Sequence, residues 1–222
     1  MHLEDGGQLA QSATAEISGL SERKRQAIQE AGTAIFLRLG YGSASMDLIA
    51  SEAKVSKQTI YNHFHSKDAL FKAIITDMTT TLMAPLSMRE AAKSTPERLL
   101  RSLGHDFLTL MLRPSSLALY RLIIAESARF PEIGGELYAV GPGRLIAVLA
   151  DYLACETRNG RLAVAEPERA AEQFIGMLSG RVQLRALLGV CEDPTEAELN
   201  IRVEHAVASF LELYASARHR DR

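Results

Sequence analysis

The sequence predicts an all-α fold of about nine helices. From Ser21 onward, apolar residues recur at three- and four-residue steps, which is the period of a helix with one buried face. Serine or threonine precedes most of these runs and can cap the first helical turn. No run alternates apolar and polar residues as a half-buried strand would. We expect a flexible N-terminal arm over residues 1–20, a first helical domain over residues 21–81 and a larger helical domain over residues 82–222.

The N-terminal elements follow from composition and caps. Residues 1–18 are rich in Gly, Ser, Ala and Gln without a sustained period, which favours a flexible arm. Ser21 can cap a helix that ends at Gly40. Three further serines, Ser45, Ser56 and Ser66, can cap the segments "MDLIASEA", "KQTIYNHF" and "KDALFKAIITDM".

The C-terminal helices have equally clear start signals. Thr95-Pro96-Glu97 combines a cap, a proline in the first turn and an acid, and Thr195 with Glu198 forms a capping box. The predicted helices are 96–112, 116–128, 134–158, 167–189 and 196–217.

The composition is that of a globular protein, with 47% hydrophobic and 23% charged residues. No apolar run reaches the roughly 18 residues of a membrane span, and the N-terminus lacks the apolar core of a signal peptide. Cys155 and Cys191 are too few and too far apart for a disulfide framework or a zinc site. We therefore expect a cytoplasmic protein with no membrane partner, no metal and no cofactor.

Residues 45–64 predict a helix-turn-helix, because two short helices are joined only by a tight turn at Lys54 and Val55. In the second helix only Ile60 and Phe64 are strongly apolar, and the remaining side chains are polar. Residues 19–72 carry eight Lys/Arg and five Asp/Glu, a net charge of +3, whereas the rest of the chain carries −5. A polar, locally basic helix suits DNA, but the pattern alone is equally compatible with a solvated surface helix.

The segment "SASMDLIASEAKVSKQTIYNHFHSKDALFKAII" decides between these interpretations, because it resembles the helix-turn-helix of the TetR family of bacterial transcriptional repressors. The resemblance implies that the second helix reads the major groove and that Lys67 binds a phosphate at the start of the next helix. Ala44, where the family often has Thr, and Lys54, where Gly is frequent, depart from the pattern. A left-handed Lys54 would cost roughly 1 kcal/mol. The implied DNA-contacting residues are Ser45, Lys57, Gln58, Thr59, Tyr61, Asn62, His63 and Lys67.

The C-terminal segments "RFPEIGGELYAVGPGRL", "RNGRL" and "FIGMLSG" resemble the AefR-like subgroup of that family. The resemblance implies a domain that binds a small-molecule effector and forms a homodimer. Apolar stripes on the last two helices are candidates for a four-helix dimer interface; the alternative is that they pack within one subunit. The candidate interface residues are Phe174, Met177, Leu178, Val203, Val207, Phe210 and Tyr214.

A cavity for a hydrophobic effector is expected between the middle helices. Its candidate residues are His105, Phe107, Met111, Tyr120, Ile124, Arg144 and Gln183, although aromatic and Met side chains at helical spacing are more often core.

No enzyme is expected, because the chain has no Gly-rich phosphate loop, HExxH or G-x-S-x-G motif. The sequence thus predicts a homodimeric repressor that binds a palindromic double-stranded operator and is released by a small molecule. Under this hypothesis, Lys67→Ala weakens DNA binding without affecting the fold. The competing hypothesis is a helical ligand-binding or scaffold protein that has lost specific DNA binding.

Overall fold

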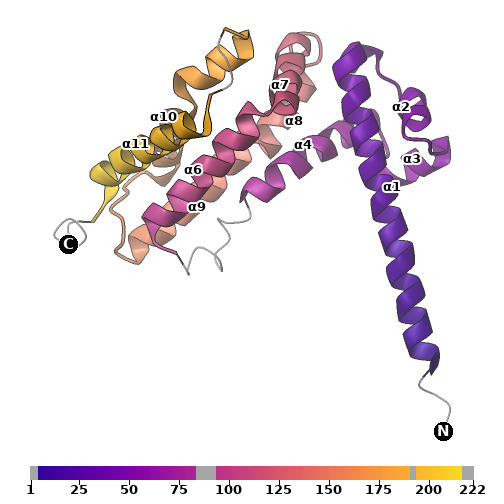
Figure 1. Cartoon of the computed structure of the whole chain (residues 1–222), viewed down its shortest axis with the longest axis horizontal. Coiled ribbons are helices and arrows are strands. Elements are labelled where there is room, and N and C mark those ends of the chain that lie inside the picture. Colours follow the sequence, from indigo (N-terminus) through magenta and orange to yellow (C-terminus); the bar gives the residue numbers. More distant parts are fainter. Residues whose placement is uncertain (1–4, 84–93, 191–193, 217–222) are drawn as a thin grey trace. The chain divides into compact units, whose positions relative to one another are not determined.

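The structure, a computed structural model, describes residues 5–83, 94–190 and 194–216, and the all-α prediction is confirmed. The chain divides into two compact units between Ile74 and Ile75, inside helix α4. The first unit contains α1 (Asp5–Ser43), α2 (Met46–Glu52), α3 (Lys57–His63) and the beginning of α4 (Lys67–Met83) (Figure 1). The second contains the remainder of α4 together with α6 (Pro96–Leu112), α7 (Pro114–Glu126), α8 (Pro131–Val140), α9 (Pro142–Arg158), α10 (Pro167–Leu188) and α11 (Glu196–Tyr214).

Helix α1 begins earlier than the sequence pattern predicts. Its helical backbone starts at Asp5 instead of Ser21, so most of the expected arm is helical. Alanine and glutamine are good helix formers, and they sustain a helix even where no apolar stripe marks it. At the other end, Gly40 leaves helical geometry with φ 80° and ψ 164°, which confirms the predicted break.

The first unit packs around an aromatic cluster. The Phe36 and Phe71 rings meet edge to face with centroids 5.3 Å apart, and Tyr41 lies 5.7 Å from Phe36 and 5.2 Å from Phe71. Ile49 of α2 and Ile60 of α3 are fully buried. These contacts fix the two short helices, because seven-residue helices are marginal without tertiary packing.

The second unit begins most of its helices with proline. Residues 96, 114, 131, 142 and 167 are prolines in the first helical turn, where a missing N–H costs nothing. The prediction of a single helix over 134–158 is wrong. The chain leaves helical geometry at Gly141, and Pro142 starts a new helix. Helices α8 and α9 together are long and apolar enough, by length and composition alone, to cross a membrane. However, Leu145, Leu149 and Leu153 belong to the packed core, so we interpret the pair as core helices.

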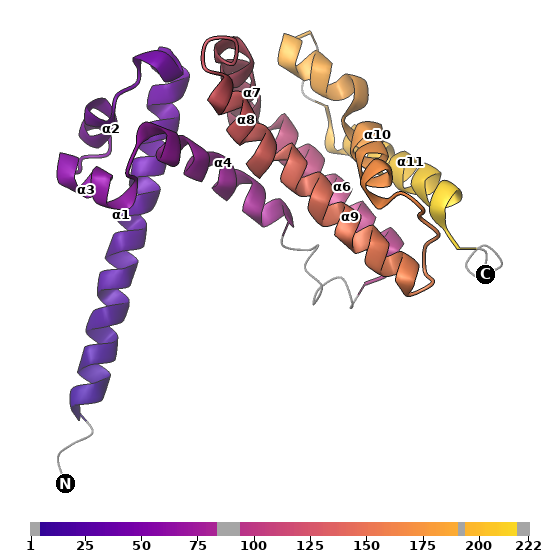
Figure 2. The same cartoon turned by 180° about the vertical axis from the view of Figure 1, so that it is seen from behind.

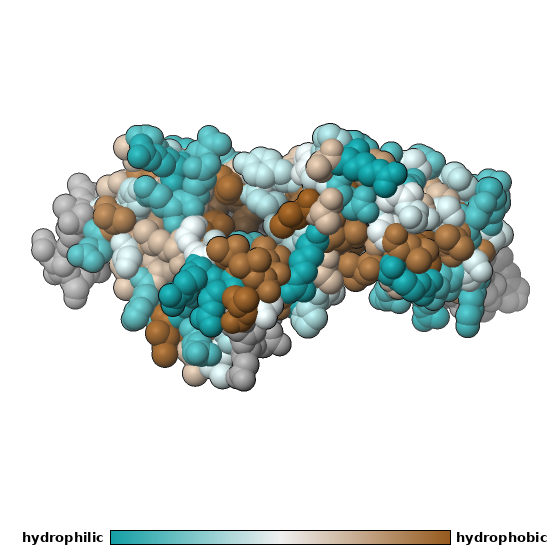
Figure 3. Space-filling model, turned by 90° about the horizontal axis from the view of Figure 1, so that it is seen from above, coloured by the Kyte–Doolittle hydropathy of each residue, from teal (hydrophilic) through white to brown (hydrophobic). Residues whose placement is uncertain are grey.

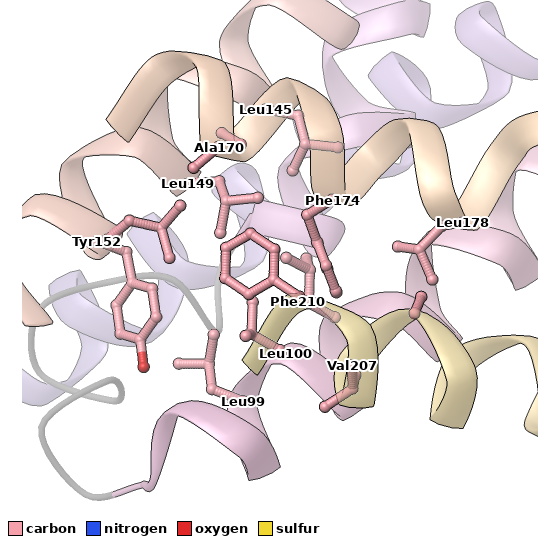
Figure 4. Packing of buried hydrophobic residues seen from close by; sticks show 14 of the residues in the cluster. Leu99, Leu100, Leu145, Leu149, Tyr152, Ala170, Phe174, Leu178, Val207 and Phe210 are labelled. Carbon is pink, nitrogen blue, oxygen red and sulfur yellow. The ribbon is translucent and has the colours of Figure 1, made fainter. Parts of the chain in front are cut away.

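The core of the second unit lies between α6, α9, α10 and α11 (Figure 1 and Figure 2). Figure 4 shows Phe174 and Phe210 directed toward one another among leucines, with ring centroids 5.2 Å apart. The α10 and α11 stripes pack against α6 of the same chain, which corrects the predicted dimer interface for its fully buried residues; for Met177 and Tyr214 the interface stays a prediction. Phe174, Leu178, Val203, Val207 and Phe210 are each at most 2% exposed, while Met177 and Tyr214 pack against this core and are partly buried.

Helix α10 is kinked at Gly180, which has φ 36° and ψ −136°. Arg202 of α11 donates to the carbonyls of Met177 and Leu178 at 3.4 and 3.3 Å and so satisfies acceptors beside the kink. At the end of the helix, Arg121 of α7 donates to the Ala186 and Leu187 carbonyls at 2.6 and 2.8 Å. Arginines from two other helices therefore cap the two halves of α10.

Candidate nucleic-acid interface

The α2–α3 connection is a Schellman turn with a lysine in the left-handed position. Val55 N–H donates to the Ala50 carbonyl at 3.0 Å, and Lys54 N–H donates to the Ser51 carbonyl at 3.2 Å. Lys54 has φ 54°, so the positive φ considered at this position is present. Gly160 occupies the equivalent position after α9 with φ 71°, which is the residue such turns prefer.

Helix α3 has one buried side and one exposed side. Ile60 is 0% exposed, and Phe64, directly after the helix, is 3% exposed. The opposite side presents Lys57, Gln58, Tyr61 and Asn62 to solvent, with Thr59 and His63 half-buried beside them. The groove-facing residues implied by the sequence thus lie together, apart from the hydrophobic anchor of the helix.

Several of these side chains already have partners within the unit. The Gln58 amide donates to the Asn62 side-chain carbonyl at 2.8 Å, and the hydroxyls of Thr59 and Ser56 share a hydrogen bond of 2.8 Å. Ser45 accepts the Leu48 N–H at 3.2 Å and caps α2, as predicted. Such pairs pre-order the surface, but they must be exchanged for any contact with a base or a phosphate.

Lys57 forms an exposed ion pair with Asp47 of α2, with Nζ 2.8 Å from the carboxylate. The hydrogen bond and the charge of Asp47 raise the pKa of Lys57 above its ordinary value. Asp47 also accounts for the favourable charge in the first turn of α2. Any anion that approaches Lys57 must therefore compete with this carboxylate.

Lys67 is held by backbone carbonyls. Its ammonium group donates to the Tyr41 carbonyl at 2.8 Å and to the Ala44 carbonyl at 3.2 Å, and it lies 4.4 Å from the Tyr41 ring centroid. Ser66 accepts the Ala69 N–H at 3.0 Å and confirms the predicted cap of α4. Lys67 consequently ties the start of α4 to the end of α1, a structural role that the sequence pattern does not reveal.

A separate cavity of about 150 Å³ lies within the second unit, between α6, α7, α9 and α10. Four of the seven candidate effector-contacting residues line it: Phe107, Met111, Tyr120 and Gln183. The other three do not. Ile124 is 62% exposed, Arg144 is exposed and His105 is half-buried outside the cavity lining. His105 and Arg144 lie two positions and one position before the lining residues Phe107 and Leu145, and such near neighbours point to different faces of a helix.

Sequence reasoning missed the two serines of this cavity, Ser116 and Ser179. Ser116 follows Pro114 at the start of α7, so its sequence position resembles that of an ordinary helix-start residue. Only the packing of α7 against α6 and α10 turns it inward. Burial raises the pKa of the neighbouring Tyr120 hydroxyl, in keeping with an apolar surrounding.

Comparison with known proteins identifies both units. The model of bacterial regulatory proteins of the tetR family matches residues 28–74, which contain the α2–α3 pair. A second model, the AefR-like transcriptional repressor, C-terminal domain, matches residues 98–216, more than half of the chain. The chain belongs to the TetR family. It is therefore a helix-turn-helix transcriptional regulator and not an enzyme.

Solved TetR-family structures share the fold over nearly their full length. A TetR-family transcriptional regulator from Mesorhizobium loti MAFF303099 is 30% identical, with a TM-score of 0.74 over 88% of this chain and 98% of that chain. The flavonoid-responsive regulator FrrA is 30% identical, with a TM-score of 0.71 over 87% of this chain and 98% of its own. FadR from Bacillus subtilis, solved in complex with stearoyl-CoA, is 16% identical with a TM-score of 0.64 and supports the fold alone.

The curated HTH-type relatives match over about a third of this chain or less. The HTH-type transcriptional regulator YhgD of Bacillus subtilis (strain 168) is 41% identical over 59 residues. The HTH-type transcriptional repressor DhaR of Mycobacterium sp. (strain GP1) is 34% identical over 72 residues. The matches cover 27% and 32% of this chain and 31% and 36% of those relatives, about a third of their length.

Proposed function

We propose that this TetR-family regulator is a cytoplasmic homodimeric repressor that binds a palindromic operator through α3 and releases it when a small effector binds the second unit. The observation that carries the proposal is the division of α3 into a buried anchor and an exposed polar side. A duplex major groove about 12 Å wide admits one such helix.

Each side chain of the polar surface has a proposed role. Gln58 and Asn62 suit bidentate pairing with adenine, which requires them to exchange their mutual hydrogen bond for contacts with a base. Lys57, Tyr61 and His63 suit base edges or phosphates at the groove rims, with Ser45 and Thr59 donating hydroxyls. Lys67 retains one ammonium proton for a phosphate beyond its two carbonyl partners.

A two-fold palindrome requires a dimer, and we place its interface on the outer surfaces of α10 and α11. Leu184 and Leu188 of α10 are 58% and 66% exposed, and Ile201 of α11 is 58% exposed. A groove of about 1230 Å³ runs between these helices. Apolar side chains also reach the surface among polar ones in the space-filling view (Figure 3). Such exposed leucines on neighbouring helices are typical of a subunit interface.

Substitutions of an exposed residue at the proposed interface and of a buried core residue should have different effects. Leu188→Glu should yield folded monomers. The charge is solvated in the single chain, where Leu188 is exposed, but it would be buried against a partner at the proposed interface. Phe174→Ala, by contrast, removes a 0% exposed ring and should lower the melting temperature. The fraction of this variant that folds should still have the mass of a dimer. Light scattering coupled to size exclusion measures both. A dimeric Leu188→Glu protein would move the interface elsewhere.

Effector release is proposed to run through α4. This helix starts at Lys67 in the first unit, and its Ile75 lines the cavity of the second unit. An effector that prefers the DNA-incompetent position of α4 shifts the population away from the bound state, by about 1.4 kcal/mol for each tenfold loss of affinity. FrrA, which is 30% identical, is described as flavonoid-responsive, which supports effector binding by this protein.

Selection of binding sites from random DNA tests the proposal. The wild-type protein should enrich a palindrome at low salt. Tyr61→Ala should weaken binding to all sequences and flatten the salt dependence, whereas Gln58→Ala should relax preference at one position of each half-site. Arg98→Ala, an exposed arginine of the second unit, is the matched charge control and should change neither. Absence of any enriched palindrome would favour the ligand-binding or scaffold alternative.

A further inference from the structure

The cavity of the second unit is lined without charge. Among the described residues, none of its fourteen lining side chains is an acid, a base or a histidine. Its polar groups are the hydroxyls of Ser116, Ser179 and Tyr120 and the amide of Gln183. The volume of about 150 Å³ equals that of an engineered apolar cavity known to accept benzene. The space therefore suits one ring and not a long chain.

Ser116 has a buried hydroxyl without a partner. The residue is 4% exposed, and within the described residues its Oγ makes no hydrogen bond. Two other serines of this unit avoid that state: Ser179 of α10 donates to the Ile175 carbonyl at 2.8 Å, and Ser127 at the C-cap of α7 donates to the Ile123 carbonyl at 2.5 Å. Ser116 is the third residue of α7, so the residue four positions earlier belongs to another helix and offers no such acceptor. A buried hydroxyl left unpaired disfavours the folded state, which points to a ligand atom as its partner.

Two helix starts contribute to the lining of the cavity. Ser116 lies in the first turn of the 13-residue α7, and Gly141 and Pro142 begin the 17-residue α9. N–H groups in a first helical turn lack intrahelical acceptors and carry partial positive charge. They favour a hydrogen-bond acceptor on the ligand, as does a serine hydroxyl that can donate.

We propose that the cavity binds an uncharged, single-ring aromatic molecule that carries one oxygen, with that oxygen hydrogen-bonded to Ser116. This rests on the proposed function only in treating the cavity as the effector site. A carboxylate is disfavoured, because its burial without a cationic side chain loses hydration that the helix starts replace only in part. A pure hydrocarbon would fill the space and leave the Ser116 hydroxyl unpaired.

Calorimetric titration of the full chain, without DNA, tests this with three matched probes: 4-methylphenol, toluene and 4-methylbenzoate. The wild-type protein should bind 4-methylphenol about tenfold more tightly than toluene, which is the scale of one hydrogen bond made instead of lost. Ser116→Ala should abolish that preference and leave toluene affinity unchanged. Ser115→Ala, the exposed neighbour in the same helical turn, should retain the preference.

Several results would overturn the assignment. They are equal affinity for toluene and 4-methylphenol, tighter binding of 4-methylbenzoate, an unchanged preference in Ser116→Ala, or no binding of any probe. A second measurement checks the premise without a ligand: Ser116→Ala should raise the melting temperature, since it removes an unpaired buried hydroxyl, and a lower value would show that the hydroxyl is satisfied. Because the titration contains no DNA, its failure would not contradict operator binding. Failure of the operator selection would likewise not contradict ligand binding in the cavity.

Discussion

Lys67→Met should destabilise the first unit even in the absence of DNA. The substitution keeps the apolar stem but removes the ammonium group that donates to the Tyr41 and Ala44 carbonyls. Both acceptor residues are buried, at 2% and 5% exposure, so water replaces the lost donor poorly. A hydrogen bond from a charged group contributes roughly 1.5–3 kcal/mol, and the cation–π contact with Tyr41 adds about 0.5 kcal/mol. Allowing for partial solvation, we expect a loss of about 2 kcal/mol.

The measurement must separate the two units, since a two-unit chain need not unfold in one step. Native-state amide exchange of Leu70 and Phe71, in the first turns of α4, reports the stability of the first unit directly. Lys57→Met is the matched control, because its ion pair with Asp47 is exposed on both sides and should contribute little to stability. Equal protection in Lys67→Met and the control would refute the structural role of Lys67. It would also restore the expectation that this residue acts only on DNA.

Three further outcomes are expected. Lys54→Gly should stabilise the first unit by about 1 kcal/mol and raise its melting temperature, because Lys54 has φ 54°; an unchanged melting temperature would mean that the turn is unstrained. Arg161→Ala should cost about 3 kcal/mol of unfolding free energy in urea titrations, because it leaves the 1% exposed Glu156 carboxylate, now 2.5 Å from the guanidinium, without its partner; an unchanged midpoint would contradict this. Hydrogen bonds from the Thr195 backbone and hydroxyl lower the pKa of Glu198. The stabilisation from these bonds is therefore present above the usual Glu pKa and is lost as pH falls. Thr195→Ala should reduce the melting temperature at pH 7 and have less effect at pH 3.

The local signals in the sequence were sufficient for the helix starts. Ser45, Ser56, Thr95 and Thr195 cap the helices they were predicted to cap, because a cap depends on backbone groups two or three residues away. The break at Gly40 is equally local. Where the signal was weaker, prediction failed: the apolar period continued through Gly141, and the early turns of α1 carried no apolar stripe.

By itself, therefore, the sequence determined the all-α class, the helix-turn-helix and the polar side of α3, since each follows from spacing along one or two helices. Only the tertiary structure decided which surfaces meet. An apolar stripe has the same pattern whether it faces its own chain or a second subunit, and Phe174 and Phe210 face their own. The carbonyl partners of Lys67 lie 26 and 23 residues away along the chain, and Ser116 enters a cavity formed by several helices. Such contacts arise from the three-dimensional packing of distant segments, which no local pattern records.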